Sequence, residues 1–297
     1  MLRGTLYVVG TPIGNLDDLT PRARQALGAS QVVACEDTRK TRVLMTRCGL
    51  RTPLRSHHKF NEARGLDGFL EILRRGAAVA LVSDGGTPGV SDPGALLVRR
   101  ARAEGHAIVP IPGPSAVTTL WSASGFPPGP LTFIGFLPHR QGERRRALLA
   151  LRDDPRALLF FEAPHRLAGS LADMQEILGD RPAFLGREMT KLHEEFIAGP
   201  LSEIRRAFAG KRVRGEIALL VEGASVAATR TAAVVPSGSG VSTGMPEGPP
   251  ESIPDAVRGL VGAGWDRKEA MRRVARDRGL SRRDVYKALV DAEGGDA

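Results

Sequence analysis

The residues that most clearly indicate a functional site lie in one glycine-rich stretch, Ser83-Asp84-Gly85-Gly86-Thr87-Pro88-Gly89-Val90-Ser91-Asp92-Pro93-Gly94. Glycines let the backbone approach a ligand closely and adopt positive φ angles, while the two prolines stiffen the chain. The side chains of Asp84, Ser91 and Asp92 can hold such a loop by local hydrogen bonds. We interpret this stretch as a ligand-binding loop; an elaborate crossover loop is the structural alternative.

Two further loops have a similar character. Gly10-Thr-Pro-Ile-Gly14-Asn15 follows one apolar run, and Pro110-Ile-Pro-Gly113-Pro114-Ser115 follows another and opens a helix, where exposed N–H groups suit an anion. Together with Glu36 and Asp37, the first loop is reminiscent of a dinucleotide site. It lacks the glycine that approaches the phosphates, however, and Pro12 has no N–H to donate. A nicotinamide site is therefore not favoured, and a tight strand-to-helix turn explains this loop equally well.

Histidine and cysteine usage gives no metal or disulfide signature. His57-His58 and His193 could suggest a metal, but no third ligand follows at a known spacing, so no metal is predicted. Cys35 and Cys48 are too few for a disulfide framework or a cysteine-based zinc site. Both are predicted to be reduced thiols.

The elements that position these loops form a predicted α/β domain over residues 1–114. Apolar runs predict strands at Thr5–Val9, Gln31–Cys35, Val79–Ser83 and Ala107–Pro112, with helical patterns between them. This alternation is typical of a mostly parallel sheet covered on both faces, which binds ligands beyond the carboxyl ends of its strands. Thr20-Pro21 and Asp92-Pro93 each predict a helix start, with a capping side chain before proline at the first helical position.

A second α/β domain is predicted over residues 115–223. Its expected strands are Leu131–Phe136, Ala157–Phe161, Ala183–Gly186 and Ile217–Val221, and its expected helices are Arg144–Leu151, Leu167–Leu178 and Ser202–Ala209. Glu194–Ile197 is predicted to add an antiparallel strand, so we expect a mixed sheet.

The remaining residues are predicted to form a linker and a helical tail. Residues 224–252 are rich in Gly, Ser, Pro, Ala and Thr, which predicts a flexible linker. Residues 253–297 carry apolar side chains at helical spacing, and Asp266 and Ser281 are predicted caps of two further helices. The pattern is typical of a helix-turn-helix, and a three-helix cap on the body fits it equally well. The tail's arginines crowd these helices: Arg272, Arg273, Arg276, Arg282 and Arg283.

Composition and charge describe an ordinary globular protein with a basic balance. The 297 residues are 42% hydrophobic and 25% charged, which favours two domains, and the formal net charge is +9. More than half of this excess lies in residues 1–114. Such charge attracts polyanions by releasing counterions, although a merely basic surface has the same composition. The apolar run Leu6–Val9 is too short for a signal peptide, and no run is long enough to span a membrane, so we expect a cytoplasmic protein.

Taken together, the loops and four further motifs closely resemble one bacterial family. The further motifs are Cys35-Glu-Asp-Thr-Arg39-Lys40-Thr41, Ser56-His-His-Lys-Phe-Asn61-Glu62, Phe161-Glu-Ala-Pro-His165-Arg166 and Gly186-Arg-Glu-Met-Thr-Lys191. The family is that of the ribosomal RNA small-subunit methyltransferase I enzymes, 16S rRNA cytidine 2′-O-methyltransferases of the tetrapyrrole-methylase superfamily. The resemblance runs from Gly4 to Gly223 and, more weakly, over Ile253–Leu289. Gly85 departs from the family's usual alanine, and Gly89 from a larger apolar residue.

The resemblance implies a two-domain class III methyltransferase fold with a C-terminal helical appendage. It implies S-adenosylmethionine between the domains, usually a homodimer, and 16S rRNA or the 30S ribosomal subunit as substrate. The implied cofactor-binding residues are Gly86, Thr87, Val90, Ser91, Ser115, Ala116, Phe161, Ile217 and Ala218. The substrate-binding residues that we expect are Thr11, Pro12, Asn15, Arg39, His58, His165, Arg166 and Arg187. The three arginines suit phosphates, because a guanidinium fork matches phosphate oxygens.

The sequence defines less clearly which residue accepts the proton and which atom accepts the methyl group. Glu36, Glu162, Glu188 and Lys191 are the main candidates for a general base, with His58 and His165 behind them; a salt bridge or an RNA contact is the alternative for each. The resemblance implies a ribose 2′-hydroxyl as the acceptor, and the lack of a cysteine in a Pro-Cys loop and of an Asn-Pro-Pro-Tyr-like loop reinforces it. A tetrapyrrole-type small-molecule methyltransferase and a non-catalytic RNA-binding factor remain as alternatives.

Overall fold

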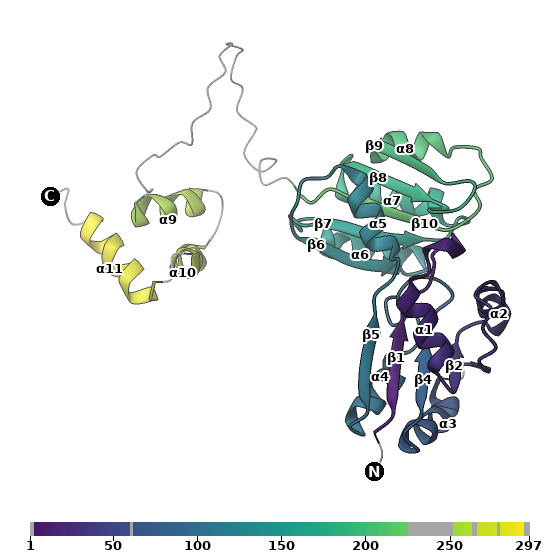
Figure 1. Ribbon diagram of the computed structural model, residues 1–297. Coiled ribbons are helices and arrows are strands. Elements are labelled where there is room, and N and C mark those ends of the chain that lie inside the picture. Colours follow the sequence, from purple (N-terminus) through teal and green to yellow (C-terminus); the bar gives the residue numbers. More distant parts are fainter. Residues whose placement is uncertain (1–2, 60–61, 225–251, 263–265, 278–279, 294–297) are drawn as a thin grey trace. The chain divides into compact units, whose positions relative to one another are not determined.

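A computed structural model describes residues 3–59, 62–224, 252–262, 266–277 and 280–293. The chain divides into two units, Met1–Ala233 and Val234–Ala297, which we describe separately. Within the described residues, the first unit contains two five-stranded sheets and the second contains three helices (Figure 1). Most of the predicted linker, residues 225–251, lies outside the described residues, and the predicted domain boundaries stay predictions.

The first sheet is parallel throughout. Its strands are β1 (Thr5–Val9), β2 (Val32–Cys35), β3 (Leu54–Ser56), β4 (Ala78–Leu81) and β5 (Ala107–Ile111), in the order β3-β2-β4-β1-β5. The four strands predicted from apolar runs are present, with ends that shift by one or two residues. Strand β3 was not predicted, because three residues at a sheet edge are too few to show a periodic pattern.

Helices cover both faces of this sheet, as predicted (Figure 1). Helices α1 (Pro21–Ala29) and α2 (Thr38–Arg47) bury Leu27 and Met45 against one face, and the short helix η1 (Leu16–Asp18) precedes α1. Helices α3 (Glu62–Arg74) and α4 (Ala95–Ala103) bury Phe69 and Leu97 against the other. The sheet is therefore apolar on both sides, and its polar chemistry is confined to the loops at its ends.

The two predicted helix starts have different outcomes. Helix α1 begins as predicted, with Pro21 in first position and the Thr20 hydroxyl accepting from the Ala23 N–H at 3.1 Å. The prediction that Asp92 caps α4 is wrong, because this helix begins at Ala95 and its N-cap, Gly94, has no side chain. The Glu62 carboxylate from α3 accepts instead, from the N–H groups of Gly94 at 3.1 Å and Leu96 at 3.2 Å.

The second sheet is mixed, as predicted. Its strands are β6 (Leu131–Phe136), β7 (Ala157–Glu162), β8 (Pro182–Arg187), β9 (Glu195–Pro200) and β10 (Ile217–Val221), in the order β6-β7-β10-β8-β9. Strands β6 and β7 are parallel and all other pairs are antiparallel; β9 is the antiparallel strand predicted at Glu194–Ile197, and it pairs with β8. Helices α6 (Gln141–Leu151), α7 (Leu167–Leu178) and α8 (Leu201–Ala207) pack on one face, and α5 (Ala116–Ser124) on the other.

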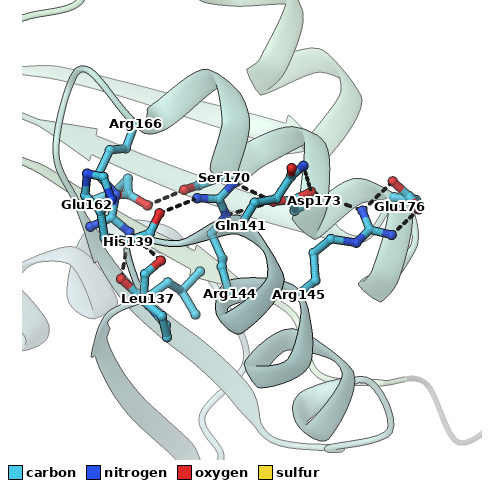
Figure 2. Close-up of polar contacts among 11 residues, drawn as sticks. Leu137, His139, Gln141, Arg144, Arg145, Glu162, Arg166, Ser170, Asp173 and Glu176 are labelled. Atoms are coloured by element: carbon cyan, nitrogen blue, oxygen red, sulfur yellow. Dashed lines mark hydrogen bonds and ion pairs between the residues drawn. The ribbon is translucent and has the colours of Figure 1, made fainter.

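A buried ion pair joins α6 to α7 behind this sheet (Figure 2). Arg144 Nη2 lies 2.6 Å from Asp173 Oδ2, and the two side chains are only 9% and 3% exposed. Gln141 and Arg145 also donate to Asp173, and Arg145 continues to Glu176. Burial alone would raise the pKa of Asp173, but these donors outweigh it and hold the pKa below its ordinary value. The carboxylate is therefore fully satisfied and fixes the spacing of the two helices.

The second unit is a small helical cluster. Its helices are α9 (Ile253–Gly262), α10 (Arg267–Asp277) and α11 (Arg282–Glu293), packed around buried Val257, Val274 and Leu289. Ser281 and Asp284 form the predicted capping box, each backbone N–H donating to the other side chain at 3.2 Å. The predicted turn at Gly279 and the side chains of Arg276 and Arg282 lie outside the described residues. Among the described residues, no helix has the length and apolar character needed to cross a bilayer.

Candidate active site

The three predicted loops meet at the carboxyl ends of β1, β4 and β5. Thr11 and Gly86 exchange backbone hydrogen bonds of 2.9 and 3.0 Å, which join the first loop to the loop after β4. Gly10 lies so close to Gly113 that a Cβ atom on Gly10 would stand 2.8 Å from the Gly113 nitrogen. Because any side chain here would push the loops apart, the glycines serve close backbone approach.

The loop after β4 also reaches the second sheet. Gly135 of β6 has a φ of +72°, and a Cβ atom there would stand 2.7 Å from Ser91 Oγ. The β6–β7 pairing shifts register between Phe133 and Gly135, so the strand is locally bent at this contact. Ser91 itself has a positive φ of 64°. The loop from Ser83 to Gly94 therefore connects the two sheets rather than standing free in solvent.

A cavity of about 350 Å³ lies between the loops and the second sheet. Its size falls within the range of small-molecule sites. All nine residues predicted to bind the cofactor line it: Gly86, Thr87, Val90, Ser91, Ser115, Ala116, Phe161, Ile217 and Ala218. The structure thus brings the whole predicted set around one cavity, while the cofactor role of each residue stays a prediction.

The second sheet gives the cavity an apolar wall. Phe161 makes edge contacts with Phe133 and Phe136, with ring centroids 5.1 and 5.7 Å apart. Phe136 lines the cavity and is still 55% exposed, and Met189 and Ile217 extend the apolar surface. The sequence did not single out Phe136 and Met189, because an apolar run does not tell which of its side chains face a ligand.

Carboxylates also line the cavity. Asp84 accepts from Lys40 Nζ at 2.7 Å and from the Asp37 N–H at 3.0 Å, which ties the motif at the start of α2 to the loop. Arg39 binds the Asp37 carboxylate and holds the pKa of that group well below its ordinary range. Burial raises the pKa of Glu36, and the charge of Asp84 raises it further. Asp84, Asp92 and Glu216 line the cavity, and none of them was predicted as a site residue.

Three of the four main base candidates have contacts that compete with proton transfer. Among the four main candidates, all of them described, Glu162 is the one that lines the cavity. Glu162 is only 3% exposed, and its carboxylate accepts from Ser170 Oγ and the Ala163 N–H while Arg166 Nε lies 3.3 Å away. These three contacts hold the carboxylate in place, so a structural role is favoured over a catalytic one.

Glu188 and Lys191 pair with each other at 2.8 Å outside the cavity lining, and Lys191 also contacts Glu216 at 3.0 Å. The hydrogen bond from Lys191 lowers the pKa of Glu188. Burial opposes the charge on Lys191, but its two carboxylate partners outweigh this and raise its pKa. The ammonium group is thus charged at neutral pH, which argues against Lys191 as a base.

The predicted substrate contacts separate into buried and accessible residues. Thr11 and Pro12 are buried, and the Thr11 hydroxyl points at the carbonyl groups of Ser83 and Gly86, so this residue holds the loops together. Asn15 is exposed; its side chain caps η1, and its N–H donates to Thr190 Oγ1 at 3.0 Å. His165 is exposed as well, and His58 is half-buried beside Glu36.

The three arginines predicted to contact phosphate also differ. The side chain of Arg39 is 89% exposed and could reach a polyanion while paired with Asp37. Arg166 is turned inward, where its Nη2 donates to the carbonyl groups of Leu137 at 2.6 Å and Pro138 at 3.0 Å (Figure 2). Arg187 Nε donates to Glu195 at 2.7 Å. The geometry therefore favours Arg39 as a phosphate ligand and argues against Arg166. Across the described residues, no three His, Cys, Asp or Glu side chains group as metal ligands would.

Comparison with known proteins identifies the class of this site. A profile described as Tetrapyrrole (Corrin/Porphyrin) Methylases matches residues 5–205. The fold is shared with a solved cobalt precorrin-4 methyltransferase (TM-score 0.54, 18% identity, 73% of this chain and 94% of that chain). It is also shared with the methyltransferase CobJ (TM-score 0.55, 22% identity, 74% of this chain and 95% of that chain). Two sheets with a cavity between them thus define a methyltransferase of the tetrapyrrole-methylase class.

Relatives of higher identity narrow the class to one family. The protein named Ribosomal RNA small subunit methyltransferase I from Halalkalibacterium halodurans is 40% identical over 286 residues, 96% of this chain and 94% of that protein. Proteins of the same name from Thermotoga maritima (44% over 220 residues, 74% and 99%) and Synechocystis (35% over 291 residues, 98% and 99%) also match. The chain belongs to the ribosomal RNA small subunit methyltransferase I family.

Proposed function

We propose that this enzyme transfers a methyl group from S-adenosylmethionine to the ribose 2′-hydroxyl of a cytidine in 16S ribosomal RNA of the small subunit. The observation that carries the proposal is the cavity, because every residue expected to bind the cofactor lines it. The names of the relatives support a small-subunit rRNA substrate. A tetrapyrrole substrate has the description of the family profile and a shared fold behind it, the fold at identities of 18–22% in these two structures.

The chain's residues fit the proposed cofactor. When bound, S-adenosylmethionine supplies a methyl group activated on a sulfonium. The apolar wall at Phe161 and Ile217 suits the adenine ring and the thioether carbons. Ser115 is the N-cap of α5 and makes no side-chain hydrogen bond to that helix, so its hydroxyl and the first N–H groups of α5 suit a carboxylate.

The reaction that the site must support is a displacement at a methyl carbon. The chain's main task is to hold the acceptor oxygen in line with the bond that breaks, and such alignment is worth on the order of 7–11 kcal/mol. The joined loops around Thr11 and Gly86 give the cavity a fixed floor for this purpose. Outside the cavity lining, the exposed side chains of Arg39 and Asn15 are available to the RNA.

The helical tail is proposed as an RNA-binding arm. Arg272 and Arg283 are exposed on its helices, and a tethered basic element adds affinity for a polyanion. Deletion of residues 224–297 should leave cofactor affinity intact and weaken binding to the ribosomal substrate. The Thermotoga maritima relative aligns over 99% of its length with only 74% of this chain, which supports a functional shortened enzyme. Equal methylation rates at limiting substrate would show that the tail is not an RNA arm.

Two further expectations follow from the family rather than from a contact. We propose a homodimer, which sedimentation equilibrium would test directly. A substrate in the small ribosomal subunit would place the enzyme in the cytoplasm.

The decisive experiment locates the methyl group. The protein is incubated with methyl-labelled S-adenosylmethionine and either 30S subunits or free 16S rRNA, and the product is hydrolysed in alkali. A 2′-O-methyl group blocks cleavage of its own phosphodiester, so the label should appear in alkali-resistant dinucleotides. Label found wholly in mononucleotides would place the methyl group on a base and overturn the proposal.

A further inference from the structure

Asp92 lines the cavity, although the sequence predicted a different role for it. The expected task was to cap α4, but Glu62 takes that role from a different helix. The Asp92 carboxyl is thereby released from the helix and lines the cavity beside Ser91. Gly89 at a φ of +80°, Ser91 at +64° and Gly94 at +123° surround it with turns that few residues adopt. The loop thus keeps an unusual backbone path that presents this side chain to the ligand space.

Three carboxylates from different elements surround Asp92. Glu36 follows β2, Asp84 follows β4 and Glu216 precedes β10, and all three act on Asp92 by charge. Two of them are paired with cations: Asp84 with Lys40 at 2.7 Å, and Glu216 with Lys191 at 3.0 Å. Asp92 has no such cationic partner among the described residues; the Ser83 hydroxyl acts on it by a hydrogen bond and also contacts the carbonyl groups of Gly85 at 3.3 Å and Gly86 at 3.5 Å.

These surroundings make Asp92 a weak acid. Burial raises the pKa of Asp92 to about 6, the nearby carboxylates add to this rise, and the hydrogen bond with Ser83 partly offsets it. A general base works best when its pKa lies near the operating pH, because it is then ionised and still able to hold a proton. Glu162, the cavity carboxylate predicted from the sequence, lacks this freedom because Ser170 and Arg166 occupy it.

We propose that Asp92 is the group that removes the proton from the acceptor hydroxyl. The inference rests on the proposed function, since it needs a hydroxyl acceptor in this cavity. The hydroxyl oxygen forms the new O–C bond with the methyl carbon, and the S–C bond breaks with its electron pair kept by sulfur. The hydroxyl proton passes to the Asp92 carboxylate and leaves later to solvent. The neutralised sulfonium and the protonated carboxyl balance the charges of the step.

The test separates proton transfer from cofactor binding. D92N keeps the shape of the side chain and removes its basicity, so kcat should fall by about 10²–10⁴-fold. Affinity for S-adenosylmethionine, measured by calorimetry, should stay within a few-fold of the wild-type value. The control D67N removes an exposed carboxylate from α3 and should leave both quantities unchanged. A D92N enzyme that regains the wild-type rate at saturating cofactor would show Asp92 to be a cofactor ligand and overturn the proposal.

The pH profile gives a readout that a structural role would not move. Wild-type kcat/KM for the methyl donor should fall on the acid side with an apparent pKa near 6, and D92N should lack this limb. S83A removes a hydrogen bond that stabilises the carboxylate, so the limb should move to higher pH. E36Q removes a neighbouring negative charge, so the limb should move to lower pH.

The two shifted limbs keep the test valid even if D92N fails to fold. An acid limb that stays in place in S83A and in E36Q would overturn the assignment. Failure of the proposed function itself is scored separately, by wild-type label that appears in mononucleotides after alkali. Those two results are independent, because the first concerns which residue takes a proton and the second concerns which atom is methylated.

Discussion

The two walls of the cavity are built from different kinds of structure: one from loops and the other mainly from strands. The wall from the first sheet consists of loops beyond parallel strands, and it carries Asp84, Ser91 and Asp92. The wall from the second sheet consists mainly of strand residues; it carries Phe136, Phe161 and neighbouring apolar side chains, together with the carboxylates of Glu162 and Glu216. Loops can gather polar groups from several strands at one point, whereas a strand face offers a firm, apolar surface. The first wall is therefore polar, and the second is mainly apolar.

Breaking the buried ion pair between α6 and α7, which support the second sheet, should have the largest effect on stability. D173N leaves Arg144 buried without its carboxylate, so the free energy of unfolding should fall by about 3–5 kcal/mol. The matched control is E176Q, whose exposed pair with Arg145 should contribute no more than about 1 kcal/mol. Urea denaturation measures both. Equal losses in the two variants would contradict the role assigned to the buried pair.

Removing the aromatic ring at the centre of the apolar wall should weaken cofactor binding next. F161A deletes the side chain that faces the cavity and its contacts with Phe133 and Phe136. We expect the dissociation constant of S-adenosylmethionine to rise about 10- to 100-fold, since a buried aromatic contact and its desolvation are worth about 1.5–3 kcal/mol. F196A, which removes a ring stacked on Phe184 away from the cavity lining, is the control for calorimetry. An F161A protein with unchanged affinity would move the cofactor off this wall.

Polar groups on the other wall should each contribute less to cofactor affinity. T87V and S115V remove hydroxyl groups that face the cavity and should weaken S-adenosylmethionine binding by about 0.5–1.5 kcal/mol each. T118V is a suitable control, because the Thr118 hydroxyl is exposed on α5 and donates to the Ser115 carbonyl. Calorimetric titration decides the question. Wild-type affinity in both T87V and S115V would place the cofactor elsewhere.

The smallest effect is expected from Arg39, which is exposed outside the cavity lining. R39A removes one exposed guanidinium, so the KM for RNA should rise a few-fold at low salt. The slope of log affinity against log salt concentration should become shallower by about one, because one counterion fewer is released. Cofactor affinity should not change, because Arg39 does not line the cavity. R206A, on the exposed side of α8, serves as the control. If the two variants share one salt slope, Arg39 has no phosphate contact.

Local patterns were enough to predict most of the fold, because apolar runs and glycine-rich loops are written in adjacent residues. The strands Thr5–Val9, Leu131–Phe136 and Ile217–Val221 have the predicted bounds, and the mixed second sheet is confirmed. The gathering of the loops around one cavity followed from the same rule, since parallel strands end at one edge of their sheet.

The roles of individual polar residues could not be predicted in the same way. Asp92 precedes a proline like many helix caps. The start of the helix is instead bound by the carboxylate of Glu62, which lies thirty-two residues before Gly94 and accepts from its N–H. Arg166 is the residue type expected of a phosphate ligand, yet its guanidinium donates to the carbonyl groups of Leu137 and Pro138 and is turned inward. In each case the deciding partner lies far away in the chain, and a pattern of neighbouring residues does not contain it.

The raised pKa of Asp92 also links the stability of the protein to pH and to its ligand. The folded protein holds the Asp92 proton more tightly than the unfolded chain, whose carboxyl has an ordinary pKa of 3.8. This contribution is fully present below pH 4 and is lost as the pH rises towards 6, at most about 3 kcal/mol before water screens the half-buried group. A cationic ligand in the cavity favours the charged carboxylate and so recovers part of that loss. Ligand affinity should therefore increase across the same pH window by no more than a few-fold, with partial release of a proton on binding.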